Sequence, residues 1–436
     1  MRLLKTTGRG AGEARRVLEY LERRRESDKR EVTAVVRRIV NAVRKGGDKA
    51  LTKYAVQLDG FSQQSELQIS SEEMHLAWEQ TAEPIRAALK VAADNIRGFA
   101  ERQRPIGWSF APVPGLSTGQ MVRPICAVGC YVPSGRHPLP STLLMTVIPA
   151  QVAGVERIVV VSPNPARETL AAAHLLGMDH FYRVGGAQAI AALAYGTDTI
   201  SRVDKIVGPG NSYVTAAKKL VAFDCAIDML AGPTEIVITS DHGNAEYIAA
   251  ELIAQAEHDS EALAILVTAA PELATQVMAE VKSRVRSNPA AKQSLSKHGW
   301  VIVTASTEEA RAITNRLAPE HLTVDERSDT LWVQNAGSVF IGSNSPQPMG
   351  DYVSGPNHTL PTGGYARVRG GLSVMDFVKI ITVQEYDRSA LNSLGPSAIA
   401  LAEAEGLVGH ADAVRLRGVG SPALAKVPRK RKGRRA

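Results

Sequence analysis

The spacing of apolar residues predicts helices in the first hundred residues and an alternation of strands and helices after them. In "EVTAVVRRIVNAVRKGGDKALTKYAVQL", apolar residues recur every three or four positions, as on the buried face of a helix, and Gly46-Gly47 indicates a break. From about residue 120, short Val/Ile-rich runs such as "RIVVVSP", "VDKIVGPG" and "TEIVITS" end in Gly, Pro or Ser. Helical segments separate these runs, so the pattern predicts parallel sheets covered by helices in two successive α/β units.

One stretch of the second unit, "ELIAQAEHDSEALAIL" at 251–266, reads as an Ala/Leu-rich helix. Gln255 and His258 lie three positions apart and therefore share a face of such a helix. Their amide and imidazole are either a polar pair on the helix surface or half of a metal shell whose other ligands come from elsewhere. Further along, 341–371 is a Gly/Pro-rich stretch that carries His and Asp, and a loop of that length favours a functional role.

Two predicted strand-to-helix turns are rich in glycine. "RVGGAQAIAAL" passes through Gly185-Gly186 into a helix near Gln188, and "KIVGPGNSYVTAAKKL" passes through Gly208 to Asn211, a good N-cap residue. Glycine lets a ligand approach the backbone amides at the positive end of a helix, which suits a phosphate. Neither turn is the G-x-G-x-x-G fingerprint, so each is either a plain tight turn or part of a ligand site at the strand ends.

The composition is typical of a soluble globular protein, with 44% hydrophobic and 22% charged residues. The longest apolar stretch, at 143–155, is too short to span a bilayer, and no secretory signal is visible at the start of the chain. Three cysteines (Cys126, Cys130 and Cys225) do not make a disulfide framework, so we expect a reducing, cytoplasmic location.

The net charge of +7 comes from the end of the chain, where "KVPRKRKGRRA" at 426–436 carries seven Lys and Arg residues and no acid. Such a tail is either a solvated terminus or a source of weak, salt-dependent contacts with RNA or acidic surfaces. The rest of the chain is close to neutral and shows no nucleic-acid motif. The tail therefore does not define the function.

Four histidines stand out by their neighbours: His258 after Gln255, His321 after Glu320, His358 seven residues after Asp351, and His410 five residues after Glu405. Pro319 should stop the preceding helix, and on the irregular turn after it Glu320 and His321 could face one cavity. A Glu beside a His provides two bases of different strength, although the two could equally be solvent-facing residues at a helix end.

The sequence contains no CxxC pair and no HExxH, so a finger-type or protease-type zinc site is unsupported. A mixed nitrogen and oxygen shell with positions open to a substrate could form from four residues far apart in the chain: Gln255, His258, Asp351 and His410.

Eight blocks between about residue 30 and residue 418 occur in the order and near the spacing of one known family: "GCYVPSGRHPLPSTLLMTVIPAQVAGV", "VGGAQAIAALAYGT", "VDKIVGPGNSYVTAAKK", "DMLAGPTEIVI", "AQAEHDSEA", "LAPEHL", "GDYVSGPNHTLPT" and "EAEGLVGHADAVRLR". On these blocks the chain as a whole resembles histidinol dehydrogenase. The resemblance implies a zinc-dependent dehydrogenase that oxidises L-histidinol through L-histidinaldehyde to L-histidine, the last step of histidine biosynthesis, and reduces two NAD⁺.

The resemblance also implies roles for individual residues. It implies Glu320 and His321 as the catalytic pair, and it implies NAD⁺ contacts from Tyr131, Gln188 and Asn211. The implied zinc ligands are Gln255, His258, Asp351 and His410. The implied substrate contacts are Thr234, Gln255, His258, His321, Asp351, His358, Glu405 and His410.

For the fold, the resemblance implies two Rossmann-like, incompletely doubly wound α/β domains with helical extensions at both ends. The expected parts are an N-terminal helical arm (1–25), a first domain with the zinc ligands and the catalytic pair (26–125 with 236–370), an NAD-binding domain (126–235), a C-terminal helical segment (371–425) and the disordered basic tail (426–436). The family members are homodimers that swap the C-terminal segment, so Glu405 and His410 are expected to complete the partner's site.

Two positions depart from the family's pattern. Thr234 replaces the usual serine of "AGPSE", which keeps the hydroxyl and adds a methyl group, and Ser134 replaces a glycine after Tyr131. The nearest alternative is a related NAD-dependent dehydrogenase of another polar alcohol, such as a sulfopropanediol. A nucleic-acid-binding protein acting through the tail and a zinc hydrolase are alternatives of other classes.

Overall fold

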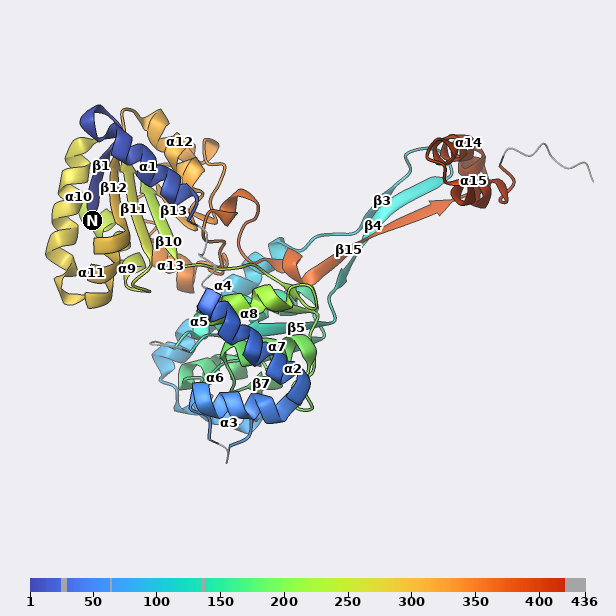
Figure 1. The fold of residues 1–436 in the computed structure, drawn as a ribbon, viewed down its shortest axis with the longest axis horizontal. Coiled ribbons are helices and arrows are strands. Elements are labelled where there is room, and N and C mark those ends of the chain that lie inside the picture. Colours follow the sequence, from blue (N-terminus) through green and yellow to red (C-terminus); the bar gives the residue numbers. More distant parts are fainter. Residues whose placement is uncertain (25–29, 63–64, 135–137, 420–436) are drawn as a thin grey trace, which may run out of the picture. The chain divides into compact units, whose positions relative to one another are not determined.

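The computed structural model describes residues 1–24, 30–62, 65–134 and 138–419. The chain divides into two compact units (Figure 1). The larger unit consists of Met1–Arg104 and Pro124–Val378, and the smaller unit consists of Pro105–Arg123 and Lys379–Ala436. The described part of the larger unit contains two six-stranded sheets, called sheet A and sheet B below.

Sheet A is parallel throughout, in the order β1 (Arg2–Lys5), β12 (Gly299–Val303), β11 (Leu263–Thr268), β10 (Glu235–Thr239), β13 (His321–Val324) and β14 (Ser338–Ile341). Alternate side chains of its strands enter two different cores. One core is completed by α1 (Ala11–Glu22) and α12 (Thr307–Leu317). The other is completed by α9 (Ala245–Ala256), α10 (Pro271–Arg284) and α11 (Pro289–His298).

Sheet B has the order β2 (Gln68–Ile69), β7 (His180–Tyr182), β6 (Arg157–Val161), β5 (Ala127–Tyr131), β8 (Lys205–Val207) and β9 (Ala226–Ile227). Its strand pairs are parallel except for the edge strand β2, which is antiparallel to β7. The core on one face includes α2 (Arg30–Asp59), α7 (Gly186–Tyr195) and α8 (Ser212–Val221). The core on the other includes α3 (Ser71–Gln80), α4 (Glu83–Arg102), α5 (Pro140–Ala153) and α6 (Arg167–Leu175).

These two helix-covered parallel sheets confirm the α/β, Rossmann-like fold class, but residues 26–125 are not where we expected them. They were grouped with 236–370, whereas α2, α3 and α4 contribute to the cores of sheet B. The N-terminal arm is also more than a helix, because β1 extends sheet A. Apolar periodicity shows which face of a helix is buried but not which sheet buries it. The expected break is confirmed, since Gly47 has φ 50° inside α2.

The composition of the stretch 251–266 suggested a single helix, and this prediction is wrong. Helix α9 ends at Ala256, His258 lies in a bend beyond it, and β11 begins at Leu263. The Asp259 side chain accepts a hydrogen bond from the amide of Glu261 at 2.9 Å, a local turn that competes with helix. Gln255 therefore sits in the last turn of the helix and His258 outside it.

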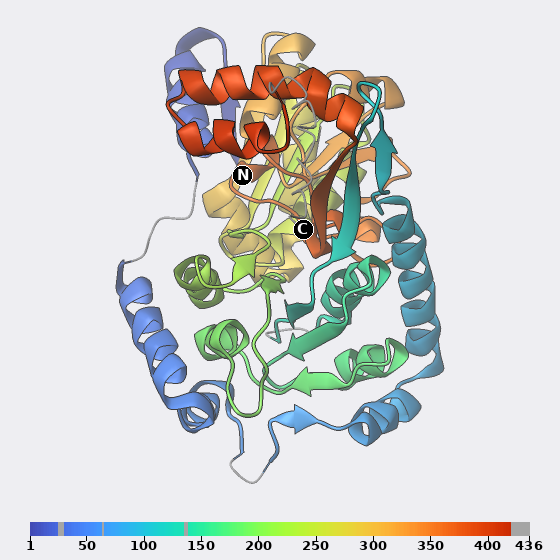
Figure 2. The ribbon, with the colours of Figure 1, turned by 90° about the vertical axis from the view of Figure 1, so that its right-hand side faces the viewer.

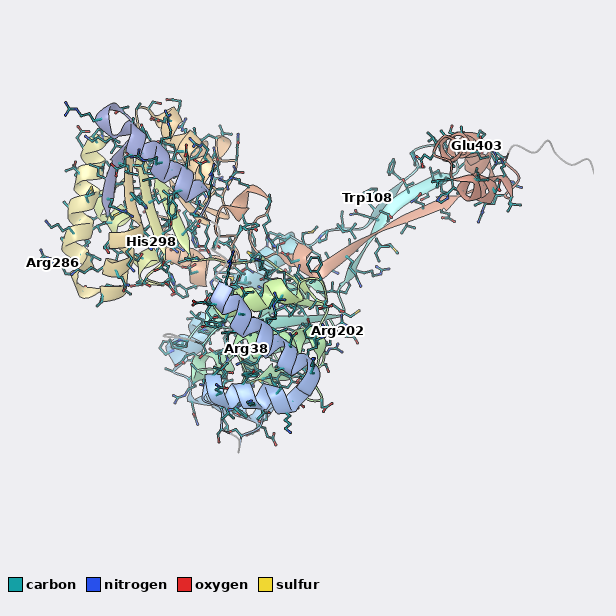
Figure 3. All side chains as sticks on the ribbon, viewed as in Figure 1. Arg38, Trp108, Arg202, Arg286, His298 and Glu403 are labelled. Carbon is teal, nitrogen blue, oxygen red and sulfur yellow. The ribbon has the colours of Figure 1, made fainter. Side chains whose placement is uncertain are left out.

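The smaller unit has a three-stranded sheet in the order β15, β4, β3, followed by two helices (Figure 2). Its elements are β3 (Trp108–Phe110), β4 (Leu116–Pro124), β15 (Val378–Tyr386), α14 (Arg388–Ala404) and α15 (Val408–Arg415). We expected only helices in 371–425, so the strand β15 corrects this prediction. The strand is exposed along almost its whole length, so it lacks the buried apolar face by which a strand is recognised in a sequence. Figure 3 labels Trp108 on β3 and Glu403 on α14.

The basic tail, 426–436, lies outside the described residues. In the described parts of the chain, none of the helices combines the length and the apolar character that crossing a membrane would require.

Candidate active site

Glu320 and His321 lie side by side at the amino edge of sheet A. Helix α12 ends at Leu317, and Ala318 takes a left-handed conformation (φ 48°) before Pro319, so the expected helix stop is confirmed. His321 opens β13 and pairs with Ile236 of β10. Both side chains are buried, with 6% and 4% of Glu320 and His321 exposed. The solvent-facing alternative for this pair is therefore wrong.

The Glu320 carboxylate is held by two donors at the start of β10. Its Oε2 accepts a hydrogen bond from the Thr234 hydroxyl at 2.6 Å and one from the Glu235 amide at 2.7 Å. Burial raises the pKa of Glu320 to about 8, although both hydrogen bonds favour the charged form. The carboxyl group can therefore exist in either protonation state near neutral pH, as a proton-transfer group requires.

The His321 ring is oriented by the same strand. Its Nδ1 lies 3.0 Å from the carbonyl oxygen of Glu235, and its Nε2 lies 3.8 Å from Oδ1 of Asp351. Because a carbonyl oxygen only accepts, Nδ1 carries the proton, and in the neutral ring Nε2 has the free lone pair. Burial lowers the pKa of His321, with Asp351 opposing the shift, so the neutral base is favoured.

Gln255 connects to the catalytic pair through Thr234. Its Nε2 donates to the Thr234 hydroxyl oxygen, and that hydroxyl donates to Glu320. Gln255 is fully buried, and its Oε1 has no hydrogen-bond partner among the described residues. A buried amide oxygen without a partner is unfavourable unless something else binds it.

Asp351 and His358 come from the Gly/Pro-rich stretch, part of which forms the short helix α13 (Gln347–Tyr352). Oδ2 of Asp351 accepts a hydrogen bond from Gln347 at 3.0 Å, and its backbone oxygen lies 2.9 Å from Nδ1 of His358. His358 also lies 3.3 Å, through Nε2, from the Thr142 hydroxyl on α5. Burial lowers the pKa of His358. The expected functional role of this stretch is therefore consistent with its contacts.

His258 is exposed, and its positive charge would lower the pKa of both His321 and His358, which places it near both rings. A cavity of about 550 Å³ is lined by His321, Asp351 and His358 together with Phe340, Met349 and Asn357. The larger unit thus brings together Thr234, Gln255, His258, Glu320, His321, Asp351 and His358.

The other two residues predicted to bind the substrate or zinc belong to the smaller unit. Glu405 follows the last residue of α14, and His410 lies in α15; both are exposed. Over the residues that the structure describes, no three His, Cys, Asp or Glu side chains are placed to hold a metal together. Three of the four expected zinc ligands, Gln255, His258 and Asp351, are in the larger unit, and one of these is an amide.

The predicted cofactor residues lie at the carboxyl edge of sheet B. Tyr131 ends β5, and its hydroxyl accepts a hydrogen bond from the Gly186 amide at 3.2 Å. Burial raises the pKa of Tyr131 to about 12, so it stays a neutral phenol. Gln188 is fully buried and donates to Oδ2 of Asp59 at 3.0 Å. The structure therefore brings Tyr131 and Gln188 to one turn.

Two backbone amides of these turns, those of Gly185 and Gly208, already donate to carboxylates and are therefore not free for a phosphate. Asp59 accepts a hydrogen bond from the Gly185 amide at 2.9 Å, and Asp228 accepts one from the Gly208 amide at 2.8 Å. Asn211 is the N-cap of α8, as predicted, and its side chain accepts from two amides of the first turn. The two carboxylates come from distant parts of the chain, so the local sequence could not reveal them.

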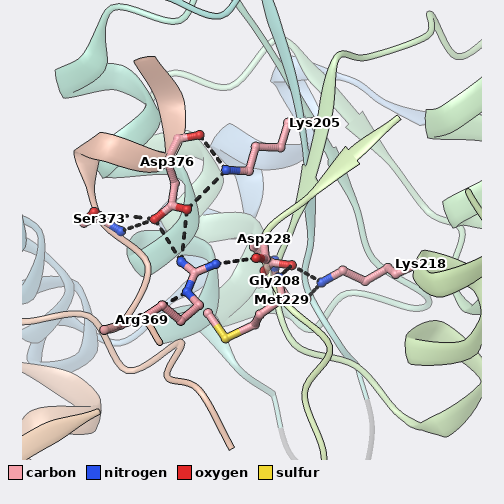
Figure 4. A network of polar contacts seen from close by, with 9 residues as sticks. Lys205, Gly208, Lys218, Asp228, Met229, Arg369, Ser373 and Asp376 are labelled. Carbon is pink, nitrogen blue, oxygen red and sulfur yellow. Dashed lines mark hydrogen bonds and ion pairs between the residues drawn. The ribbon is translucent and has the colours of Figure 1, made fainter. Parts of the chain in front are cut away.

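A buried network of charged residues supports the Gly208 turn (Figure 4). Lys218 and Asp228 form an ion pair, and Nζ of Lys218 also donates to the Gly208 carbonyl at 3.0 Å. Arg369 donates to the backbone oxygen of Asp228 and to both carboxylate oxygens of Asp376, at 3.0 and 3.1 Å. This network connects the turn before Asn211 to the end of the Gly/Pro-rich stretch through Arg369 and to the segment after it through Asp376, and none of these contacts was predicted.

The helices that directly follow the strands of the two sheets differ in the charges of their first turns. The first turns of α5, α7 and α8 around sheet B contain no acidic residue, whereas that of α6 contains Glu168. On sheet A, by contrast, the first turns of α9, α10 and α12 contain Glu246, Glu272 and Glu308. A helix N-terminus without its own carboxylate is the more favourable neighbour for an anionic cofactor. The carboxyl edge of sheet B is therefore the better candidate for NAD⁺.

Comparison with known proteins gives a consistent result. The family model for histidinol dehydrogenase matches residues 22–418. The histidinol dehydrogenase of Methanothermobacter thermautotrophicus is 46% identical, covering 92% of this chain and 97% of its own length. That of Sulfurimonas denitrificans is 40% identical, covering 94% and 99%. A solved structure of histidinol dehydrogenase from Elizabethkingia anophelis is 35% identical, with a TM-score of 0.90 and coverage of 96% and 98%.

Proposed function

The chain belongs to the histidinol dehydrogenase family, and on that premise we propose that it oxidises L-histidinol to L-histidine with NAD⁺ as the electron acceptor. The observation that carries this proposal is the buried pair of Glu320 and His321, held by the Glu235 peptide beside Asp351. The named relatives are all histidinol dehydrogenases, so the alternative of a sulfopropanediol substrate gains no support.

The reaction removes two hydrides from one carbon, and the two bases divide the proton transfers. In the first step, Nε2 of His321 accepts the alcohol proton while the hydride passes to NAD⁺ and the aldehyde forms. Glu320 then accepts a proton from the water that adds to the aldehyde. In the second step, His321 accepts a proton from the hydrate while a second NAD⁺ takes the hydride, which leaves the carboxylate.

The donor set fits a zinc ion, and we propose Gln255, His258, Asp351 and His410 as its ligands. The fit rests on the Gln255 Oε1, which is buried without a hydrogen-bond partner and lies next to the catalytic pair through Thr234. Imidazole and carboxylate groups are ordinary zinc ligands, while an amide oxygen is a harder and weaker one. The ion would hold the amine and imidazole of the substrate, which is a positioning role.

For the remaining contacts, we propose that Thr234, His358 and Glu405 line the substrate site and that Tyr131, Gln188 and Asn211 contact NAD⁺. Tyr131 and Gln188 share one turn at the carboxyl edge of sheet B, where parallel α/β sheets commonly bind ligands. Thr234 keeps the hydroxyl that its hydrogen bonds use, so the departure from serine leaves its role intact.

We further propose a homodimer in which the smaller units are exchanged, so that Glu405 and His410 reach the partner's site. The smaller unit leaves large apolar side chains exposed: Trp108 (51%), Phe110 (57%), Ile380 (46%), Val408 (63%) and Leu416 (87%). Apolar surface of this extent marks a face that another chain covers. The cytoplasmic location stays a prediction.

The proposed function is tested by incubating the purified protein with zinc, NAD⁺ and L-histidinol and following NADH. We expect turnover with L-histidinol and little with L-leucinol, which has the same amino alcohol but no imidazole. Equal rates with both compounds, or no turnover of L-histidinol, would contradict the proposed substrate.

A further inference from the structure

We propose that Arg24, just beyond the end of α1, is a positioning residue for the oxidation, because its ion pair with Glu235 fixes the peptide that orients the catalytic pair. This inference rests on the proposed function, which gives Glu320 and His321 their chemical roles. Arg24 is about 210 residues away from Glu235 in sequence, and it comes from the N-terminal arm rather than from the segments that carry the predicted site residues.

The contact between Arg24 and Glu235 is buried and two-pronged. Nε of Arg24 donates to Oε1 of Glu235 at 2.7 Å, and Nη2 donates to Oε2. Only 10% of the Arg24 side chain and 4% of the Glu235 side chain are exposed. A guanidinium that meets both oxygens of a carboxylate fixes its orientation as well as its distance. Such a pair can therefore hold Glu235 in one place.

The arginine is itself held in place. Its Nη1 donates to the carbonyl of Leu21 at 2.7 Å, which folds the guanidinium back over the last turn of α1. That helix is anchored by Ala14, Leu18 and Leu21, which are buried in the core on one face of sheet A. The pair thus transmits the position of a packed helix to the first residue of β10.

Glu235 contacts both members of the catalytic pair through its backbone. Its amide donates to Oε2 of Glu320 at 2.7 Å, and its carbonyl accepts from Nδ1 of His321 at 3.0 Å. The Glu235 side chain also accepts a hydrogen bond from the Gly363 amide at 2.9 Å. A displacement of Glu235 would therefore change the orientation of both Glu320 and His321. Small displacements of reacting groups lower reaction rates strongly.

The charge of Arg24 matters as well as its shape. Glu235 is a buried carboxylate beside a second buried carboxyl group, Glu320. Among the described residues, no ion pair of Glu235 other than that with Arg24 is found, and burying an unbalanced charge is strongly unfavourable. Without the guanidinium, the start of β10 would shift toward water. This shift would disturb the peptide on which Glu320 and His321 depend.

The competing explanation is that Arg24 has a purely structural role and only attaches α1 to the rest of the protein. The chain offers a matched control for this possibility. Nη2 of Arg316 pairs with Oε1 of Glu22 at 2.5 Å and joins the same helix end to α12. Among the described residues, neither side chain of this second pair forms a hydrogen bond or ion pair with β10. Arg316→Gln therefore removes an ion pair from the same helix end while leaving both hydrogen bonds between Arg24 and Glu235 in place.

The experiment compares the full-length zinc-loaded enzyme with Arg24→Gln, Arg24→Lys and Arg316→Gln. Rates with L-histidinol and with added L-histidinaldehyde are measured well below each variant's unfolding temperature. For Arg24→Gln we expect kcat to fall at least about tenfold while KM stays within about threefold, the signature of misaimed groups rather than lost binding. Arg24→Lys keeps the positive charge but not the bidentate contact, so its kcat should lie between that of the wild-type enzyme and that of Arg24→Gln.

Arg316→Gln should keep the wild-type kcat within about twofold, even where its unfolding midpoint is lowered. A wild-type kcat in Arg24→Gln, or an equal loss of kcat in Arg316→Gln, would overturn the positioning role. Should Arg24→Gln fail to fold, an unchanged kcat in Arg24→Lys would overturn it equally. The proposed function is tested separately by the wild-type enzyme and Glu320→Gln in the same assay, so the two ideas fail independently.

Discussion

The hydroxyl of Thr234 donates a hydrogen bond to Oε2 of Glu320 at 2.6 Å while its oxygen accepts one from Gln255. One side chain therefore joins a proposed zinc ligand to a proposed general base. With these proposed roles, removal of the hydroxyl would take one hydrogen bond from the zinc ligand and one from the base.

We expect Thr234→Val, which keeps the shape and removes the hydroxyl, to raise the pKa of Glu320 further. The hydroxyl stabilises the charged carboxylate, so without it the group needs a higher pH to ionise. A charge-assisted hydrogen bond is worth about 1.5–3 kcal/mol, which corresponds to a rise of about one unit or more. The limb of the pH-rate profile that reports ionisation of Glu320 should move to higher pH by that amount.

The measurement is the pH dependence of L-histidinaldehyde oxidation, with Thr234→Ser as the control. The serine variant keeps the hydroxyl and restores the residue that is usual in the family, so its profile should match that of the wild-type enzyme. Identical profiles for Thr234→Val and Thr234→Ser would show that this hydroxyl does not tune the base.

Glu320 should also make stability depend on pH. Its folded pKa of about 8 lies above the ordinary value of 4.5, so burial favours the protonated form. The associated stability is complete below the ordinary value and is lost as the pH rises through the folded value. We expect Glu320→Gln, which cannot ionise, to unfold at a higher temperature than the wild-type protein at pH 9 but not at pH 4.

At pH 9, the free energies of unfolding of Glu320→Gln and the wild-type protein should differ by a few kcal/mol. The difference can be followed by thermal or denaturant unfolding of the metal-free protein between pH 4 and pH 9. Glu101→Gln is a suitable control, since that carboxylate is exposed on α4, a helix that packs on sheet B. A wild-type protein and a Glu320→Gln variant whose stabilities stay parallel between pH 4 and pH 9 would mean that the carboxyl ionises normally.

Exchange of the smaller units predicts that two inactive variants repair each other. His321→Gln removes a base of the larger unit, and His410→Asn removes a ligand of the smaller unit. In a mixed dimer with exchanged units, one site receives both defects and the other receives neither. Coexpression should therefore restore about a quarter of the wild-type activity, because half of the dimers are mixed and half of their sites are intact.

Coexpression of His321→Gln with Glu405→Gln gives an independent test of the exchange of the smaller units. The His410→Asn variant alone should bind less zinc than the wild-type protein. If the smaller unit served its own chain, every site in the mixture would carry one defect. Activity that stays at the level of the separate variants would therefore exclude the exchange.

The sequence predicted the local features of the site better than the long-range contacts that hold the site residues in place. Pro319 indicated that α12 stops before Glu320, and Asn211 was recognisable as an N-cap, because both signals act within a few residues. The partners of the glycine turns could not be predicted. Asp59 lies 126 residues from Gly185 and Asp228 lies 20 residues from Gly208, and each accepts a hydrogen bond from one amide that a phosphate could otherwise use.

The assignment of helices to the two sheets also depends on contacts between distant parts of the chain, which the sequence does not show directly. The alternating pattern correctly predicted two parallel sheets. The domain bounds expected from the resemblance grouped α2, α3 and α4 with the wrong sheet, because the sequence of an amphipathic helix does not show which sheet the helix covers. Arg24 was also missed. Its partner Glu235 lies at the start of a buried strand, where a carboxylate has no local signature of an ion pair.

The most direct test of the account is the number of NADH molecules formed for each L-histidinol consumed by Glu320→Gln. We predict that the wild-type enzyme forms two. In the variant, His321 still supports the first oxidation but water addition is slow, so about one NADH should form and the aldehyde should be trapped by added semicarbazide. Two NADH for each substrate, with both oxidations slowed equally and no trapped aldehyde, would contradict the division of labour between Glu320 and His321.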